Sequence, residues 1–219
     1  MSNRFESRRR AMAILFYMAI SGLLAGLPVS AGEKPMGVPR EIEEQGRDPK
    51  WAVPLELPGV PNMARVTPYL YRGAQPTAEG FRQLHAMGIK TVVSFRQLHG
   101  DSKLIGNLPM KYERIAWNAL HAESEDIVRF LKIVGDPENR PVFIHCWHGV
   151  DRTGTMAAVY RIVVQGWSRE EAVREMTDGF KMHANIYGNL LKFVRTADFE
   201  KMRIGAGLPP PPEAETDID

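Results

Sequence analysis

The residues best suited to chemistry stand together in the stretch HCWHGVDRTG, positions 145 to 154, which holds the only cysteine among the 219 residues. Cys146 ends the apolar run PVFIHC, and Arg152 follows it six positions later. A thiolate is a nucleophile, and a guanidinium can bind two oxygens of a phosphate at once. The pairing predicts nucleophilic attack on an anionic substrate, whereas a cysteine alone would be interpreted as a small buried residue ending a strand.

The elements around this stretch place it at the edge of a sheet. PVFIHC is typical of a short buried strand, and TGTMAAVYRIVVQG of a helix that ends near Gly166. A loop that runs into a helix start has free backbone N–H groups and the positive end of the helix dipole, which favour an anion. Helix starts and nearby cations also lower the pKa of a cysteine thiol. We therefore expect Cys146 to be the nucleophile of a phosphate-binding loop made of Trp147, His148, Gly149, Val150, Asp151 and Arg152.

Four residues in or next to the loop are expected to support its shape. Gly149 supplies backbone angles that other residues avoid, and Gly154 lets the helix pack closely. Thr153 can donate a hydrogen bond to the sulfur. His145 is expected to order the loop rather than to titrate during catalysis. The remaining histidines show no metal-ligand spacing, so no metal site is predicted.

Strand and helix patterns alternate through the rest of the chain. This order predicts an α/β fold with a largely parallel central sheet flanked by helices. Thr77 can cap one helix, and Ser168 with Glu171 has the spacing of a capping box. The expected strands lie within residues 64–75, 89–96, 110–117 and 141–146, and the expected helices within 77–88, 123–135, 153–166, 168–176 and 185–202.

The two ends differ from this middle part. Residues 1–31 have a basic start, an apolar run and the small residues Val29-Ser30-Ala31, which predicts a signal peptide; an uncleaved membrane anchor is the alternative. Residues 32–62 are expected to be a proline-rich extended lead-in, 63–203 the catalytic domain, and 204–219 a disordered acidic tail. We expect an exported protein, periplasmic or secreted, that meets a membrane only through its leader.

Composition and charge restrict the partners. Apolar residues make up 44% and charged residues 25% of the chain, which is typical of a globular domain. The 28 Lys and Arg and 26 Asp and Glu become 24 and 25 without the leader, which takes four arginines and one glutamate. This balance predicts no nucleic-acid partner. One cysteine cannot form an intramolecular disulfide in an oxidising compartment, which favours a functional role for Cys146.

HCWHGVDRTG resembles the HCxxGxxRT signature of the protein tyrosine phosphatase superfamily. LYRGAQPTAEGFRQLHAMGIKTVVSFR is similar to the opening of the atypical dual-specificity phosphatases, and the likeness runs from about residue 62 to 198. The resemblance implies a phosphatase of dual-specificity type, a cysteinyl-phosphate intermediate, and no metal or other cofactor. Its partner would be a phosphorylated protein or a small phosphoester.

The general acid is where the sequence departs from the family. The family places an Asp after the strand that precedes the signature, and this chain has Asn118 and Ala119 there. Asp151, inside the loop, is the first candidate to protonate the leaving oxygen. A chain without a dedicated acid is a further possibility. The alternative acids in the loop after RIAW are His121, Glu123 and Asp126.

Substrate class stays open at this stage. A phosphotyrosine or dual-specificity protein phosphatase is the first hypothesis, because aryl phosphates have good leaving groups and need the acid less. The alternatives are a phosphoinositide or inositol phosphate phosphatase, and a binding protein that has lost turnover.

Overall fold

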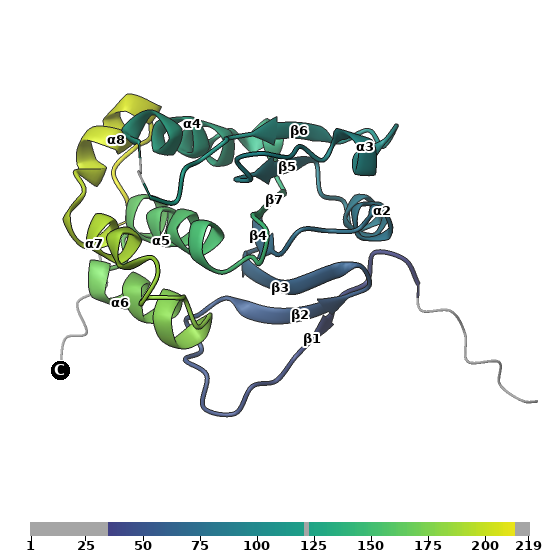
Figure 1. The fold of residues 1–219 in the computed structure, drawn as a ribbon, viewed down its shortest axis with the longest axis horizontal. Helices are drawn as coiled ribbons and strands as arrows, with labels where there is room; N and C mark the ends of the chain where they lie inside the picture. The colour runs from purple at the N-terminus through teal and green to yellow at the C-terminus, as the bar shows by residue number, and fades with distance from the viewer. Residues whose placement is uncertain (1–34, 121–122, 213–219) are drawn as a thin grey trace, which may run out of the picture. The chain divides into compact units, whose positions relative to one another are not determined.

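The computed structural model describes residues 35–120 and 123–212 of the chain (Figure 1). The predicted leader, residues 1–31, lies outside the described residues, as do His121 and residues 213–219 of the predicted tail.

A seven-stranded sheet forms the centre, with the order β1-β2-β3-β4-β7-β5-β6. Strands β4, β7, β5 and β6 are parallel, and β1, β2 and β3 extend the sheet antiparallel to one another beyond β4. The α/β class and the parallel central strands are as predicted. The strand bounds are β1 Arg40–Glu41, β2 Val53–Leu57, β3 Val60–Thr67, β4 Leu70–Gly73, β5 Thr91–Ser94, β6 Lys111–Arg114 and β7 Val142–His145.

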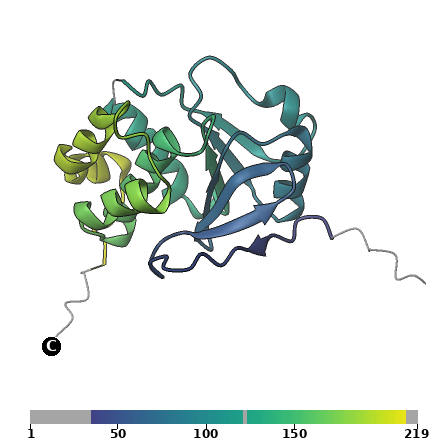
Figure 2. The same ribbon diagram turned by 60° about the horizontal axis from the view of Figure 1, so that its bottom comes forward.

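Helices cover both faces of the sheet, and two hydrophobic clusters fill the spaces between (Figures 1 and 2). The larger cluster lies under α4 to α8 and includes Ile144 and Cys146 of the central strand and its end. The smaller one lies under α2 and α3 and includes Phe143. The helix bounds are α2 Ala78–Ala86, α3 Ser102–Ile105, α4 Ser124–Gly135, the 3-10 turn η1 Pro137–Asn139, α5 Asp151–Gln165, α6 Arg169–Arg174, the π-helical η2 Glu175–Gly179, α7 Gly188–Thr196 and α8 Phe199–Ala206.

The sheet begins earlier than the sequence predicts. Residues 53–62, assigned to an extended lead-in, form β2 and the start of β3. Leu55 and Leu57 are buried at alternate positions, and the flanking Pro54 and Pro58 hide this alternation. Pro58 and Gly59 make the turn of the β2–β3 hairpin, where Leu57 pairs with Val60.

The last predicted helix is in fact two. Residues 185–202 contain α7 and the first half of α8, because Ala197 is extended and Asp198 caps α8 by accepting from the Lys201 amide. Helix α8 also continues to Ala206, into the predicted tail. Two caps are confirmed: Thr77 accepts from the Gly80 amide, and Ser168 and Glu171 form the capping box.

Candidate active site

The stretch HCWHGVDRTG joins β7 to α5, as its pattern predicts. The four parallel strands run in one direction, so the loop shares the carboxyl edge of the sheet with the segments after β4, β5 and β6. Val150 caps α5 without a side-chain hydrogen bond, which leaves the first amides of the helix open to a ligand.

Donors around the loop bind four of the five carbonyl oxygens of residues 145–149. Phe95 N–H donates to the His145 carbonyl at 2.8 Å, and Gln75 N–H to that of Trp147 at 3.1 Å. Asn62 Nδ2 donates to the His148 carbonyl at 3.1 Å, and Arg72 Nη2 to that of Gly149 at 2.8 Å. The fifth, of Cys146, lies 3.0 Å from Nδ1 of His145.

The amides of the loop are left free by this arrangement. Within residues 35–120 and 123–212, the N–H groups of residues 147–153 donate to no protein acceptor. Carbonyls held outward and unpaired amides at a helix start are what a phosphate-binding loop requires. The backbone arrangement therefore agrees with the predicted anion-binding loop.

Gly149 is sterically required. Its φ is +74°, and a Cβ there would lie 2.3 Å from the carbonyl oxygen of Gly73 at the end of β4. The loop therefore packs directly against the end of β4. The positive φ agrees with the unusual backbone angles predicted for Gly149. At Gly154, by contrast, a Cβ would be in ordinary contact, 3.5 Å from Nη2 of Arg72.

Cys146 lies at the bottom of the loop and is 3% exposed. Arg152, in the first turn of α5, is partly buried, and its Nη1 donates to the Phe95 carbonyl at 3.0 Å. This bond fixes the guanidinium at the loop while its other N–H groups remain for a ligand. Thr153 is fully buried, and its hydroxyl has no partner among the described residues.

His145 supports the loop from the other face of the sheet. Its ring is buried, stacks on Phe143, and places Nε2 3.0 Å from a carboxylate oxygen of Asp101. Burial alone would raise the pKa of Asp101, but the adjacent His145 ring outweighs it and holds that pKa below its ordinary value. Asp101 is thus a support for His145, and the expected ordering role of His145 agrees with these contacts.

Asp151 is paired with a residue from another loop. One of its oxygens accepts from the backbone N–H of His183 at 2.9 Å, and the other lies 3.0 Å from Nδ1 of the His183 ring. The Asp151 side chain is 11% exposed and that of His183 50%. The half-exposed His183 imidazole therefore contacts Asp151, the first candidate for the general acid.

The alternative acids lie at the start of α4. Glu123 precedes the helix, and Asp126 is in its first turn, where burial and then the charge of Glu123 raise the pKa of Asp126. In the part of the chain that the structure describes, no hydrogen bond or ion pair joins either carboxylate to residues 145–152. His121 lies outside the described residues.

An exposed aromatic side chain, Trp147, lies beside the loop. Trp147 is 53% exposed, and the guanidinium of Arg96 lies 4.6 Å from its ring centroid. Arg96 also donates to the Gln75 side chain at 2.6 Å, which fixes its guanidinium beside Trp147. A pocket of about 200 Å³ lies here, lined by Arg96, Gln97, Leu98, His99, Trp147 and Arg152.

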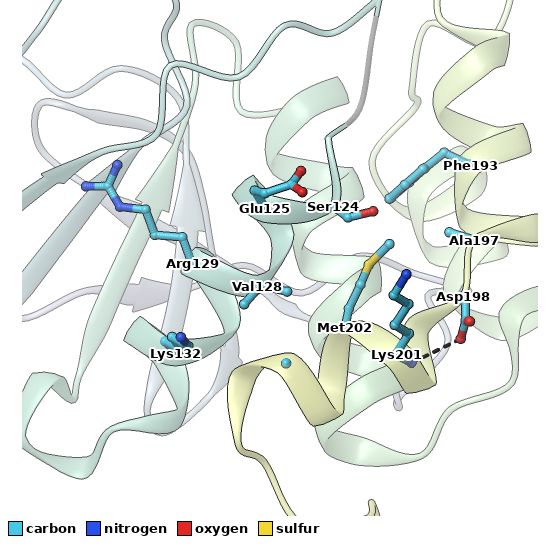
Figure 3. Close-up of a pocket in the computed structure, with 11 residues that line it drawn as sticks. Ser124, Glu125, Val128, Arg129, Lys132, Phe193, Ala197, Asp198, Lys201 and Met202 are labelled. Atoms are coloured by element: carbon cyan, nitrogen blue, oxygen red, sulfur yellow. Dashed lines mark hydrogen bonds between the residues drawn. The ribbon is translucent and has the colours of Figure 1, made fainter.

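A larger cavity of about 780 Å³ lies between α4, α7 and α8, away from the loop (Figure 3). Val128, Phe193 and Met202 form its apolar part. No residue of the phosphate loop lines it, and acidic Glu125 and Asp198 alternate with basic residues around it. Its volume therefore does not identify the active site.

Four supporting residues were not predicted from the sequence: Asn62, Arg72, Gln75 and Asp101. Three of these act through contacts to the loop more than 70 positions away in the chain. For Arg72 a signal exists, because a charged residue in the middle of the strand LYRG must be buried if the strand is central.

A single buried cysteine, an arginine and a loop of free amides together define a cysteine-dependent phosphatase. Comparison with known proteins agrees. The family model described as "DSP-PTPase phosphatase fused to NAD+ Kinase" matches residues 61–189, and the chain belongs to this dual-specificity phosphatase family. It is 32% identical over 194 residues to the dual specificity protein phosphatase TpbA of Pseudomonas aeruginosa, covering 88% of this chain and 84% of TpbA.

Solved structures show the same fold. The crystal structure of P. aeruginosa TpbA matches with a TM-score of 0.65 and 33% identity, over 74% of this chain and 99% of that chain. Another TpbA structure is a complex with pTyr. The core catalytic domain of the PP-IP phosphatase SIW14 from S. cerevisiae matches with a TM-score of 0.59 at 22% identity, over 69% of this chain and 98% of that chain, which shows the fold alone. The predicted family, fold and class of enzyme, a cysteine-dependent phosphoric monoester hydrolase, are confirmed.

Proposed function

We propose that the protein is a protein tyrosine phosphatase that uses Cys146 as nucleophile and the 147–152 loop as phosphate cradle. The observation that carries this proposal is the arrangement of the loop. Phe95, Gln75, Asn62 and Arg72 bind its carbonyls outward, while its amides donate to no acceptor in the part of the chain that the structure describes. The family is cysteine-dependent and the chain has one cysteine, which supports Cys146 as the nucleophile.

The chemistry follows from these groups. The Cys146 thiolate attacks phosphorus, the S–P bond forms and the P–O bond to the leaving group breaks. Arg152 and the loop amides bind the non-bridging oxygens through the transition state. A water then attacks phosphorus, the S–P bond breaks, and inorganic phosphate leaves with the thiolate regenerated.

An aryl phosphate fits both the pocket beside the loop and a site without an Asp at the family's usual acid position. The pocket beside the loop offers Trp147 and Leu98 to a ring and Arg152 to its phosphate. The family's usual acid position holds Asn118 and Ala119, and a phenolate is a leaving group that depends less on protonation. TpbA, a relative of which this chain covers 84%, has been solved with pTyr.

The test is a panel of phosphotyrosine peptides, phosphoserine peptides, inositol phosphates and phosphoinositide vesicles, assayed with wild type and Cys146→Ser. We expect phosphotyrosine peptides to have the highest kcat/KM, by about tenfold or more, and Cys146→Ser to release no phosphate. If kcat/KM is highest on inositol phosphates or phosphoinositides, phosphotyrosine is not the preferred substrate and the enzyme acts on that class instead. Binding of phosphopeptide without release of phosphate by wild type would show a non-catalytic protein.

We also propose that the enzyme acts after export, in the periplasm or outside the cell. The support is the basic start, apolar run and small-residue end of residues 1–31. None of the helices in the described ranges has the length and hydropathy to cross a membrane. Intact-mass measurement of protein from the native host should give a chain that begins at Gly32. A full-length chain in the membrane fraction would show an anchor instead.

A further inference from the structure

Arg72 is a fully buried cation in the sheet beneath the phosphate loop. It lies in β4 with 0% exposure and is paired in register with Ile144 of β7. Because side chains alternate along strands, Arg72 lies on the same face as Ile144 and, two residues on, Cys146. A buried guanidinium is costly unless it has charge and hydrogen-bond partners.

The contacts of Arg72 leave its charge incompletely balanced. Nη2 donates to the Gly149 carbonyl, the guanidinium lies 3.6 Å from the Phe180 ring centroid, and Nε has no hydrogen-bond partner within the described ranges. No carboxylate oxygen of those ranges lies within ion-pair distance of it. Arg72 thus binds the loop but has no ion-pair partner among the described residues.

The carboxylate whose charge raises the pKa of Arg72, Glu175, is already engaged elsewhere. Glu175 of η2 forms a two-point ion pair with Arg161 of α5, at 2.6 and 2.9 Å, and accepts from the Ala52 amide. Both partners of this pair are 2% exposed. The buried set therefore has two cations and one carboxylate, and a thiolate at Cys146 would balance it.

Burial lowers the pKa of Arg72 to about 10, while the charges of Glu175 and Cys146 raise it and those of Arg161 and Arg47 lower it. The side chain thus stays protonated in neutral solution and keeps its positive charge under the loop.

We propose that Arg72 is a positioning residue of this phosphatase, a second guanidinium that holds Gly149 from below and stabilises the thiolate form of Cys146. The proposal rests on the proposed function, in which that thiolate is the nucleophile. Arg152 differs in place and role, because it lies in the first turn of α5 and binds the substrate phosphate. Arg72 stays beneath the loop and acts on substrate only through Gly149 and Cys146.

Other charged groups also face the loop and must be kept constant in a test. The Asp151–His183 pair lies at its edge, the His145–Asp101 pair lies on the other face of the sheet, and Arg96 contacts Asp101 at 3.7 Å. The His145–Asp101 pair lies on the opposite face from Arg72, whereas Asp151 is in the first turn of α5, which packs on the Arg72 side. Arg161, Glu175 and Arg47 are the further charges that act on Arg72.

The single cysteine gives a direct measurement that needs no substrate. The rate of alkylation by iodoacetamide, followed by mass against pH, reports the thiolate fraction of Cys146 alone. We expect the midpoint of this profile to move up by about one pH unit or more in Arg72→Met. Arg72→Lys keeps the charge but loses the fork, so we expect a smaller shift together with a fall in kcat. Arg82→Met, an exposed arginine of α2, is the matched control and should leave both unchanged.

A merely structural Arg72 would lower the melting temperature and leave the alkylation midpoint where it is in wild type. That result in folded Arg72→Met would overturn the proposal. If Arg72→Met does not fold, Arg72→Lys decides, because wild-type midpoint and wild-type kcat in that variant would equally overturn it. Failure of the proposed function is a separate result, since wild type would then release no phosphate while its alkylation profile still responds to Arg72.

Discussion

Gly149 is the residue on which the shape of the phosphate loop depends most directly. It combines a φ of +74° with contact to the Gly73 carbonyl, so Gly149→Ala must move either the loop or β4. A strained backbone position costs about 1–3 kcal/mol. A displacement of about 1 Å in an active site can reduce activity roughly a hundredfold. We expect a fall of that order in kcat/KM on p-nitrophenyl phosphate, with a lower melting temperature. Gly188→Ala, where a Cβ meets open space, should change neither, and a fully active Gly149→Ala would contradict this account.

The proton donor is a second question at the residue scale. Asp151 accepts from the His183 amide and contacts its ring, and we propose that this pair protonates the leaving oxygen. We expect Asp151→Asn and His183→Gln each to reduce kcat/KM on an alkyl phosphate about a hundredfold and on p-nitrophenyl phosphate far less.

Glu123→Gln provides the matched control for this pair, because Glu123 is an exposed carboxylate of the other candidate loop. It should leave both substrates unaffected. A selective loss of kcat/KM on alkyl phosphates in Glu123→Gln, with none in Asp151→Asn, would identify the general acid in the loop after β6 instead.

At the scale of elements, Asp101 connects the start of α3 to the end of β7. It occupies the N-cap position of α3 without capping it, and its carboxylate instead contacts His145. The pKa of Asp101 is lower folded than its unfolded value of about 3.9, so the unfolded chain binds more protons between the two values. This contribution to stability is present above about pH 4 and is lost as pH falls through the folded pKa.

Asp101→Asn should therefore show a lower free energy of unfolding at pH 7 and a shallower decrease between about pH 5 and pH 3. Urea unfolding at a series of pH values measures both. Glu138→Gln, an exposed carboxylate of η1, should follow the wild-type curve. An identical pH slope in wild type and Asp101→Asn would show that the His145 contact does not stabilise the fold.

The sequence predicts those elements whose pattern is local. PVFIHC and TGTMAAVYRIVVQG gave the strand, the loop and the helix that carry Cys146 and Arg152, because apolar periodicity and glycine positions are properties of neighbouring residues. It did not predict β2, since prolines interrupt an alternation that only pairing with β3 makes visible. Nor could it predict Arg72 bound to Gly149 or Asn62 bound to His148, because these partners are 77 and 86 positions apart.

At the scale of the whole molecule, the segment before β2 is connected to the catalytic loop through a series of contacts. Arg47 Nη1 donates to the Gly179 carbonyl at 3.1 Å, and its guanidinium lies 4.9 Å from the Phe180 ring centroid. Phe180 in turn lies against Arg72, which binds Gly149. A segment whose prolines suggest a loose covering thus supports the residues under the nucleophile.

Arg47→Ala should accordingly affect both stability and turnover. Loss of the hydrogen bonds and of the cation–π contact is expected to cost about 1–3 kcal/mol in the free energy of unfolding, measured with urea. Because Phe180 and Arg72 lose support, kcat should fall severalfold while KM changes little, since the substrate still meets Arg152 and the loop amides. Arg40→Ala removes an exposed ion pair with Glu56 on the edge strand β1 and should cost less than about 1 kcal/mol with no change in kcat. An Arg47→Ala enzyme that is destabilised but keeps wild-type kcat would separate the N-terminal segment from the catalytic loop.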